Sequence, residues 1–272
     1  TTTKDNRWVA PYIDIVDTFY GRPDIPISVV KNGKTPKDSP MISIPAQRRR
    51  PNGTPVYPHR LLDGRNAPEA VAVLRRILSQ QPDDSVTIVQ IGFSTNLARL
   101  VQTDRELIAR KVHLLSMMAG DFSGGGPEYN IRIDIPAAKQ LFDNWPTPIV
   151  ISGYEVGKTI LYPARSIEHD FSYVADHPIA EAYRNYQKMP YDRPTWDLTA
   201  LLYAVRPDRN YFTLSDPGTV RVDDKGDTLF TANPAGKHRY LKVNDIQRAR
   251  ILEAFEAFAS EPPDHRRVSA TH

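Results

Sequence analysis

Three short, continuously apolar segments constrain the fold of this chain more than any other feature. They cover residues 85–91, 111–118 and 148–153. Apolar side chains recur at helical spacing in the segments that accompany them, at residues 67–80, 96–101 and 136–142. Strands that are apolar on both faces suit a parallel sheet whose crossover helices cover it on each side. The pattern therefore predicts an α/β fold, with a mostly parallel sheet flanked by helices.

The two ends of the chain follow other patterns. Residues 9–20 have helical spacing and end at Gly21, and an extended segment follows at 22–30. Residues 31–66, rich in Pro, Gly, Asn and Arg, predict a long loop, and loops of this length are often functional. After the sheet we expect helices at 179–186 and 198–205, β-hairpins within 219–243, and a closing helix at 244–259.

Asn244 is placed to cap the closing helix. Its apolar side would carry Ile246, Ile251, Leu252, Phe255 and Phe258. We expect a single domain over residues 1–260 and a polar tail over 261–272.

Composition excludes several classes of function. The 272 residues include 35 Lys and Arg, 32 Asp and Glu, and no Cys. Disulfides, thiolate metal sites and cysteine nucleophiles are therefore excluded. The net charge of +3 is small, and the densest basic run, at residues 48–50, is interpreted as a solvated loop. No apolar run approaches the roughly 20 residues of a membrane helix. We expect a small-molecule ligand, and neither nucleic acid nor a membrane as partner.

Ligands of open α/β sheets bind beyond the carboxyl ends of the strands. Those ends are residues 91–96, 118–121 and 153–155, which combine glycine with polar or acidic residues. The plainer interpretation is that every turn from strand to helix needs glycine and caps. Residues 153–159 resemble a phosphate-binding loop, but three residues separate the two glycines where the motif requires four. This spacing argues against binding of a nucleoside triphosphate.

Oxygen-bearing side chains stand out near these ends. Glu128 and Asn130 follow the glycine-rich stretch at 121–127, and Asp197 precedes a predicted helix. Carboxylates and amides suit hydroxyl-rich ligands or a hard cation such as calcium. Asp197 alone is also open to interpretation as a helix N-cap. The seven histidines show no metal-ligand spacing, and the common serine-hydrolase and zinc-protease motifs are absent.

Five blocks that occur in order carry a family resemblance. They are residues 21–27, 91–98, 118–120, 128–138, and 196–198 with 205–207. The most specific, at 128–138, is similar to Glu-Phe-Asn-x-x-x-Asp-Pro-x-Ala-Ala. Together the blocks resemble the nucleoside hydrolase family, the inosine-uridine preferring nucleoside N-ribohydrolases. The resemblance runs from Asp5 to about Val243, and it implies a nucleoside-hydrolase-like fold with a Rossmann-like core.

This resemblance implies a hydrolase that uses Ca²⁺ to hold the ribose and the attacking water. It would cleave the N-glycosidic bond of ribonucleosides through an oxocarbenium-like transition state. It assigns Asp197 and the backbone carbonyl of Ile91 to the metal. It also assigns Glu128 and Asn130 to ribose hydroxyls. A homodimer or a homotetramer is compatible with it.

Two further substrate contacts follow less directly from the resemblance. Asn6 matches a substrate-binding asparagine of the family. Trp196 stands where family members have a histidine near the leaving base. Its indole can stack on a nucleobase but cannot supply a proton at neutral pH. The nucleobase preference and the general acid are therefore left open.

The family's Asp-rich motif is absent from the sequence, and we expect it, with the general-base aspartate, upstream of Thr1. We therefore expect little or no hydrolysis by these 272 residues alone. One alternative is a catalytically impaired nucleoside- or ribose-binding protein of the same fold. Another is an interaction protein that uses the loop at 31–66 as its contact surface. The lack of cysteine fits the cytosol, whereas a removed leader would fit export.

Overall fold

The computed structural model describes residues 1–35 and 37–263, and the chain divides into two compact units. Unit 1 comprises Thr1–Ala70, Tyr162–Arg193 and the chain from Glu256 on, and unit 2 comprises Val71–Leu161 and Pro194–Phe255. Asn6 belongs to unit 1, and every other predicted site residue belongs to unit 2. The single domain expected over residues 1–260 stays a prediction. The predicted tail lies outside the described residues from residue 264 on.

Unit 2 contains the sheet and the helices that cover it. Its helices are α4 (Thr95–Lys111), α5 (Tyr129–Arg132), α6 (Ile135–Asn144), α7 (Tyr154–Lys158), α10 (Trp196–Val205) and the 3-10 turn η2 (Pro207–Arg209). Its strands are β1 (Val86–Gln90), β2 (Val112–Met118), β3 (Ile149–Ser152), β6 (Thr213–Leu214), β7 (Gly218–Val222), β8 (Thr228–Ala232) and β9 (His238–Lys242). Helices α3 (Ala70–Ser79) and α11 (Asp245–Ala259) and the short paired strands β4 (Leu161–Tyr162) and β5 (Arg193–Pro194) include the points where the chain passes between units.

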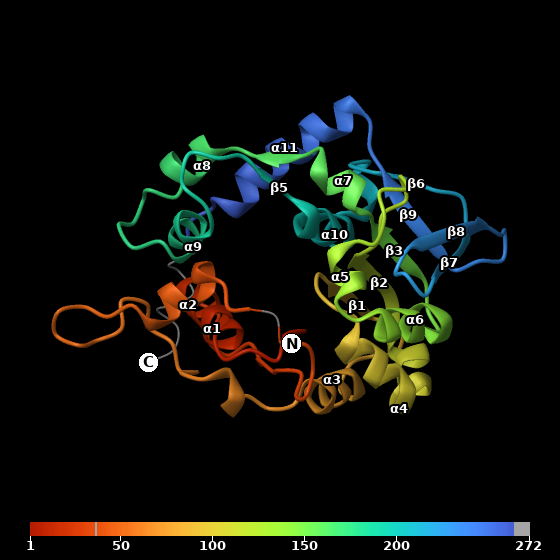
Figure 1. Cartoon of the computed structure of the whole chain (residues 1–272), viewed down its shortest axis with the longest axis horizontal. Coiled ribbons are helices and arrows are strands. Elements are labelled where there is room, and N and C mark those ends of the chain that lie inside the picture. Colours follow the sequence, from red (N-terminus) through yellow and green to blue (C-terminus); the bar gives the residue numbers. More distant parts are fainter. Residues whose placement is uncertain (36, 264–272) are drawn as a thin grey trace. The chain divides into compact units, whose positions relative to one another are not determined.

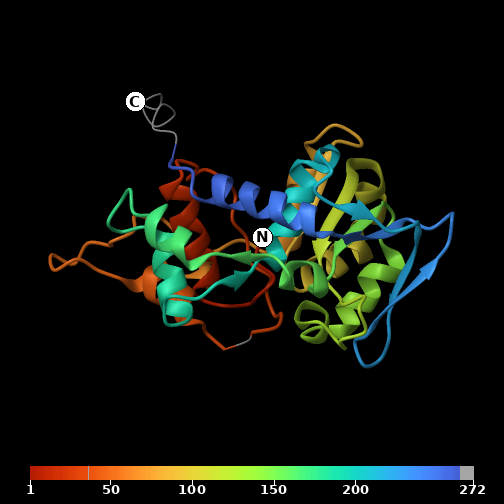
Figure 2. The ribbon, with the colours of Figure 1, turned by 90° about the horizontal axis from the view of Figure 1, so that it is seen from above.

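The sheet has the order β1-β2-β3-β9-β7-β8, with β6 paired to β9 (Figure 1). Strands β1, β2, β3 and β9 run parallel, which confirms the predicted α/β fold with a mostly parallel sheet. The predicted β-hairpins are correct only for β7 and β8, whose antiparallel ribbon forms the far edge (Figure 2). Strand β9 does not pair with β8 but returns between β3 and β7.

Side chains on the two faces of the sheet alternate, and each face has its own partner. Leu115 and Met117 of β2 and Ile151 of β3 are fully buried in the main core, with side chains of α4 and α6. The intervening Ser116 and Ser152 face the opposite side and bond to α10. Strands β2 and β3 are thus covered on both faces, as continuous apolar strands require.

Unit 1 is built from helices α1 (Val9–Phe19), α2 (Pro40–Gln47), α8 (Ala164–His169) and α9 (Pro178–Tyr186), with the 3-10 turn η1 (Gly64–Asn66). The expectation of one uninterrupted loop over 31–66 was wrong, because α2 and η1 lie within it. Ile42 and Ala46 of α2 are buried, and α2 packs against α1 and α9. Tertiary packing therefore stabilises α2, although the prolines in its sequence argue against a helix.

The closing helix α11 begins as predicted. Asn244 Oδ1 accepts a 2.9 Å hydrogen bond from the Gln247 backbone N–H, and Gln247 Oε1 accepts one of 3.0 Å from the Asn244 N–H. This reciprocal pair is a capping box. Its predicted apolar side is only partly correct, because Ile246 is 73% exposed and Phe258 is 51% exposed. No helix in the described part of the chain is long and apolar enough to span a membrane.

Candidate functional site

The carboxyl ends of β1, β2 and β3 lie together at one edge of the sheet in unit 2. Gln90 pairs with Met117, and Met118 pairs with Ser152, so the three strands end at nearly the same level. The backbone N–H of Tyr154, just after β3, donates a 2.8 Å hydrogen bond to the carbonyl oxygen of Gly120, just after β2. This bond joins the turns after β2 and β3, at the edge where ligands of such sheets bind, and ligand binding there stays a prediction.

Glu128 is held at this edge by backbone donors. It is the N-cap of α5, and its carboxylate accepts hydrogen bonds from the N–H groups of Asn130 (2.9 Å), Ile131 (3.3 Å) and Gly120 (3.2 Å). Glu128 is buried, with 7% of its surface exposed. Burial raises the pKa of the Glu128 carboxyl, the three backbone donors oppose that rise, and the charge of Asp197 adds to it. The carboxylates of Glu128 and Asp197 are thus close enough to interact.

Asn130 leaves one polar atom for a ligand. Its Nδ2 donates a 3.2 Å hydrogen bond to the Met118 carbonyl oxygen at the end of β2. Its Oδ1 accepts no hydrogen bond from the residues that the structure describes. The Asn130 Oδ1 is therefore an acceptor that the described residues leave unused, and hydroxyl groups of a ligand are donors to such atoms. The sequence prediction that Glu128 and Asn130 act together agrees with this geometry, and their ribose contact stays a prediction.

Asp197 lies in the first turn of α10, not before it. Thr195 is the N-cap residue and Trp196 begins the helix, so the interpretation of Asp197 as an N-cap was wrong. Asp197 is exposed. A carboxylate in the first helical turn is stabilised by the helix dipole. Asp197 therefore presents a negative charge to solvent and to Glu128 from a favourable position.

Trp196 is fixed by Tyr154. The indole Nε1–H donates a 3.1 Å hydrogen bond to the Tyr154 carbonyl oxygen, and the two rings stack with centroids 5.5 Å apart and planes 19° apart. The amino group of Lys158 lies 5.5 Å above the Tyr154 ring. The single indole donor is used within the protein, so Trp196 can offer a ligand its ring and no proton.

Hydroxyl groups anchor α10 to the sheet. Ser116 Oγ donates a 2.8 Å hydrogen bond to the Ala200 carbonyl oxygen. Thr199 Oγ1 donates to the Trp196 carbonyl oxygen at 2.6 Å, so Ser152 Oγ is the donor in its 2.5 Å contact with Thr199 Oγ1. This chain of bonds positions the turn that carries Trp196 and Asp197.

Gly157, the second glycine of the segment that resembles a phosphate-binding loop, has a packing role. The segment forms the five-residue helix α7, and a Cβ at Gly157 would lie 2.3 Å from the Trp196 Cα. The glycine is needed because α7 and α10 approach so closely. Its role is in packing, which agrees with the spacing argument against a phosphate loop.

Gln90 is a residue at this edge that sequence reasoning missed. Its Nε2 donates to Ser94 Oγ at 3.3 Å, while its Oε1 is buried and has no hydrogen-bond partner in the described chain. Ile91 follows directly and is 49% exposed. A polar residue at the last position of a predicted strand, beside the expected ligand-binding edge, was the available signal.

The residues present do not by themselves make a calcium site. Asp197 and the Ile91 carbonyl are the two predicted ligands, whereas calcium takes about six to eight oxygens. Within residues 1–35 and 37–263, no group of three or more histidine and acidic side chains could hold a metal ion. The carboxylate of Glu128 is already bonded to backbone N–H groups.

Asn6 lies in unit 1, two residues before Trp8, which is the N-cap residue of α1. Its Oδ1 accepts a 2.8 Å hydrogen bond from the Trp8 backbone N–H, and its Nδ2 donates to Asp38 Oδ1. Asn6 is 6% exposed. Its predicted contact with a ligand stays a prediction, and its observed role is to order the start of a helix.

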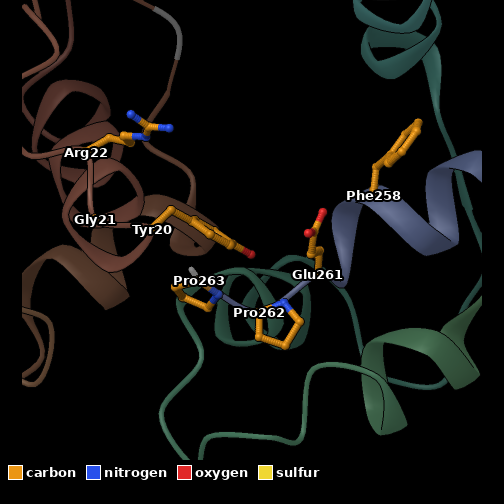
Figure 3. Close-up of a pocket in the computed structure, with 7 residues that line it drawn as sticks. All are labelled: Tyr20, Gly21, Arg22, Phe258, Glu261, Pro262 and Pro263. Atoms are coloured by element: carbon orange, nitrogen blue, oxygen red, sulfur yellow. The ribbon is translucent and has the colours of Figure 1, made fainter. Parts of the chain in front are cut away.

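Two pockets in unit 1 contain none of the predicted site residues. In one, Tyr20 and Arg22 come from the end of α1, and Phe258 and Glu261 come from α11 and the segment after it (Figure 3). The other is lined by residues of α2 and of the segments near Trp8 and His59. Neither pocket belongs to the edge of the sheet where the candidate site lies.

A family model described as inosine-uridine preferring nucleoside hydrolase matches residues 17–255. The chain belongs to the nucleoside hydrolase family. Membership agrees with the resemblance carried by the five sequence blocks. It also agrees with a sheet whose carboxyl edge collects Glu128, Asn130 and Asp197. A comparison with curated proteins finds no match.

Several solved structures share the fold of this nucleoside hydrolase family member. A plant nucleoside hydrolase is 20% identical, with 93% of this chain and 86% of that chain covered and a TM-score of 0.66. The purine-preferring ribonucleoside hydrolase from Gardnerella vaginalis is 18% identical, with 92% and 84% covered and a TM-score of 0.69. The type III effector protein XopQ, complexed with adenosine diphosphate ribose, is 16% identical, with 92% and 79% covered and a TM-score of 0.61.

Proposed function

We propose that this protein binds ribonucleosides at the carboxyl edge of β1, β2 and β3 and hydrolyses their N-glycosidic bond. The observation that carries the proposal is the convergence of Glu128, Asn130 and Asp197 at this edge. Family membership supports a glycosidase-type activity. The substrate class is supported by the ribonucleoside hydrolase from Gardnerella vaginalis, which shares the fold.

Each residue has a distinct part in this proposal. The Asn130 Oδ1 and a Glu128 carboxylate oxygen accept hydrogen bonds from the ribose hydroxyls. The ring of Trp196 contacts the nucleobase, and base stacking of this kind tolerates different bases. Breaking the C1′–N bond develops positive charge on the sugar, which the carboxylates of Glu128 and Asp197 stabilise. Trp196 does not protonate the leaving base, because its N–H is bonded to Tyr154.

Two of the predicted site residues could bind calcium. Asp197 and the Ile91 carbonyl would be donors to a bound calcium ion, which would supply Lewis-acid chemistry. The described residues do not complete the coordination of a calcium ion, and we propose none of them as the general base. For the 272-residue chain we therefore expect nucleoside binding to exceed turnover.

The second candidate is a nucleoside- or ribose-binding protein of the same fold that lacks turnover. The absence of a metal-holding acidic group from the described chain favours it. The effector structure complexed with adenosine diphosphate ribose supports it further, since that protein holds a ribose-containing ligand on this fold.

The test combines two measurements on one sample. Inosine and uridine hydrolysis is followed with calcium and with a chelator, and binding of both nucleosides is measured by calorimetry. The variants are Asp197→Ala and, as an exposed carboxylate elsewhere in unit 2, Glu106→Gln.

Each outcome separates the candidates. Calcium-dependent hydrolysis that Asp197→Ala abolishes supports the hydrolase. Binding without hydrolysis, lost in Asp197→Ala and kept in Glu106→Gln, supports the binding protein. Absence of both binding and turnover contradicts both. If the coding sequence continues upstream of Thr1, turnover that appears only in the longer chain supports the hydrolase.

A further inference from the structure

A pocket in unit 1 combines basic side chains with an apolar floor, and it shares no residue with the candidate site of unit 2. Its lining residues are Arg7, Trp8, Ala46, Gln47, Arg49, His59 and Leu62, and its volume is about 310 Å³. We propose that this pocket binds a small phosphorylated molecule through Arg49, Arg7 and His59. The sequence indicated only a solvated loop at residues 48–50, and it did not predict that Arg49 lines a pocket.

The three consecutive arginines at 48–50 have different partners because the chain is extended there. The Arg50 N–H donates to the Thr54 carbonyl oxygen at 2.8 Å, and the Val56 N–H donates to the Arg48 carbonyl oxygen at 3.0 Å. In such a ladder, successive side chains point to opposite faces.

The ion pairs follow this alternation. Arg48 and Arg50 both reach Asp176, at 3.1 and 3.7 Å, and Arg48 also pairs with Glu181. Arg49, between them, lines the pocket on the other face. Its guanidinium has no hydrogen bond or ion pair with any described residue. An unpaired guanidinium at a concave surface is suited to bind an oxyanion.

The charge around the pocket is positive. One acid, Asp63, pairs with a lining residue, Arg7, at 3.1 Å, and it also pairs with Arg65. The Arg65 hydrogen bond lowers the pKa of Asp63 to about 2, with a smaller contribution from Arg7. Asp63 is thus a permanent anion at neutral pH, but two arginines share it. Arg49 has no such partner and its charge stays available.

The third polar group is the imidazole of His59. Its Nδ1 lies 2.7 Å from the Tyr57 carbonyl oxygen, and a carbonyl oxygen is only an acceptor, so Nδ1 carries the proton. The other ring nitrogen, Nε2, has no partner in the described chain. It is available to accept a hydrogen bond from a hydroxyl group of a ligand, including the hydroxyl of a protonated phosphate.

The floor of the pocket is rigid. Ala46 is 5% exposed and belongs to a core cluster with Ile15, Val56 and Tyr57, against which Trp8 packs. The Arg7 guanidinium lies 4.5 Å above the Trp8 ring. A basic group fixed over an aromatic ring keeps its position without a ligand, so less conformational entropy is lost on binding. The volume lies near the lower end of the range for small-molecule sites, which fits a phosphorylated molecule no larger than a mononucleotide.

The experiment measures Kd by calorimetry for inorganic phosphate, adenosine 5′-monophosphate and adenosine, at low and raised ionic strength. We expect both phosphate-bearing probes to bind, with affinity falling as salt increases. Arg49→Gln should weaken their binding about tenfold, because one charge-assisted hydrogen bond is lost. Arg22→Gln is the matched control, an exposed arginine of unit 1 that lines the other pocket.

Several results would overturn the proposal. They are unchanged phosphate binding in Arg49→Gln, equal weakening in Arg22→Gln, and equal affinity for adenosine and its monophosphate. Tighter binding of the monophosphate than of phosphate identifies a phosphate ester as the ligand, and equal binding identifies free phosphate. Adenosine binding should be lost in Asp197→Ala and kept in Arg49→Gln, so failure of this site and failure of the proposed function are distinguishable. An unchanged urea unfolding midpoint checks that Arg49→Gln is folded.

Discussion

The indole N–H of Trp196 donates a 3.1 Å hydrogen bond to the Tyr154 carbonyl oxygen, and the two rings stack. This contact joins the start of α10 to the turn after β3. It uses the single N–H of the indole within the protein, and the proposed contact of the Trp196 ring with a nucleobase stays a prediction.

Replacement of Trp196 by alanine should weaken nucleoside binding about tenfold, because stacking on one base contributes about 1–3 kcal/mol. Trp196→Phe keeps an aromatic face and should retain most of the affinity. Calorimetry with inosine and with ribose checks this, since ribose affinity should not change. Equal loss for both ligands would mean that Trp196 supports the site as a whole and does not contact the base.

Substitution of Glu128 should affect both stability and ligand binding. Glu128→Ala leaves the buried N–H groups of Gly120, Asn130 and Ile131 without their acceptor, at a cost of about 1–3 kcal/mol for an unsatisfied buried group. Urea unfolding should show the loss, and calorimetry should show weaker ribose binding. Glu106→Gln, an exposed carboxylate of α4, should change neither quantity.

Neutralisation of Asp197 should lower the pKa of the Glu128 carboxyl. Burial is the main cause of its raised pKa, and the charge of Asp197 adds to it. The raised folded-state pKa gives stability that is present at low pH and is lost as the pH rises through it. In Asp197→Asn this loss should be smaller. The carboxyl ¹³C titration of Glu128 by NMR measures the shift. An unchanged pKa would show that the two carboxylates do not interact.

His177 should make unit 1 sensitive to acid. It is 1% exposed, and its Nδ1 accepts a hydrogen bond from the Ile179 N–H at the start of α9. Burial lowers its pKa from 6.5 to about 4. The unfolded chain therefore binds a proton at higher pH than the folded chain. Stability should fall by up to about 3 kcal/mol as the pH drops from about 6.5 to about 4.

Urea unfolding between about pH 7 and about pH 4.5 measures this dependence. His177→Asn, which can still cap α9, should flatten it. His169→Gln, at an exposed histidine of unit 1, should leave it intact. The idea fails if the Asn variant keeps the full pH dependence of the wild type.

The hydroxyl of Thr199 should position α10. Thr199→Val removes the acceptor of Ser152 and the donor to the Trp196 carbonyl oxygen, with an expected loss of about 1–3 kcal/mol. Thr199→Ser retains the hydroxyl and should restore most of the stability. Nucleoside affinity measured in parallel should follow the same order, and an equal effect of both variants would implicate packing of the methyl group instead.

The sequence predicted the sheet well because its signal is local. Strands β2 and β3 are short, predominantly apolar runs bounded by turns, and such runs are typical of strands that are buried on both faces. Strand β9 was misplaced because pairing with β3 depends on contacts far apart in the chain. Helix α2 was missed because Pro40 and Pro45 mask its spacing, and packing on α9 overrides propensity.

The parts of the candidate site that lie within one short sequence block could be located from the sequence, whereas contacts between distant residues could not. Glu128 and Asn130 belong to one sequence block, and the N-cap contact that the structure shows between them was not predicted, because Glu is not a preferred N-cap residue. The bond of Trp196 to Tyr154 spans 42 residues, and no local pattern encodes it. The alternative interpretation of Asp197 as an N-cap was wrong. The N-cap residue is Thr195, two positions earlier in the chain. Boundaries of this kind depend on where the helix packs.

The missing side chain at position 157 sets a rule for anyone who redesigns this edge of the sheet. Since the backbone of Trp196 occupies the place of a Cβ there, even alanine would push the two segments apart. Attempts to engineer a proton donor at 196 must therefore keep glycine at 157. If Gly157 is replaced as well, α7 and α10 will move apart, and the effect of the new side chain at 196 cannot be separated from that movement.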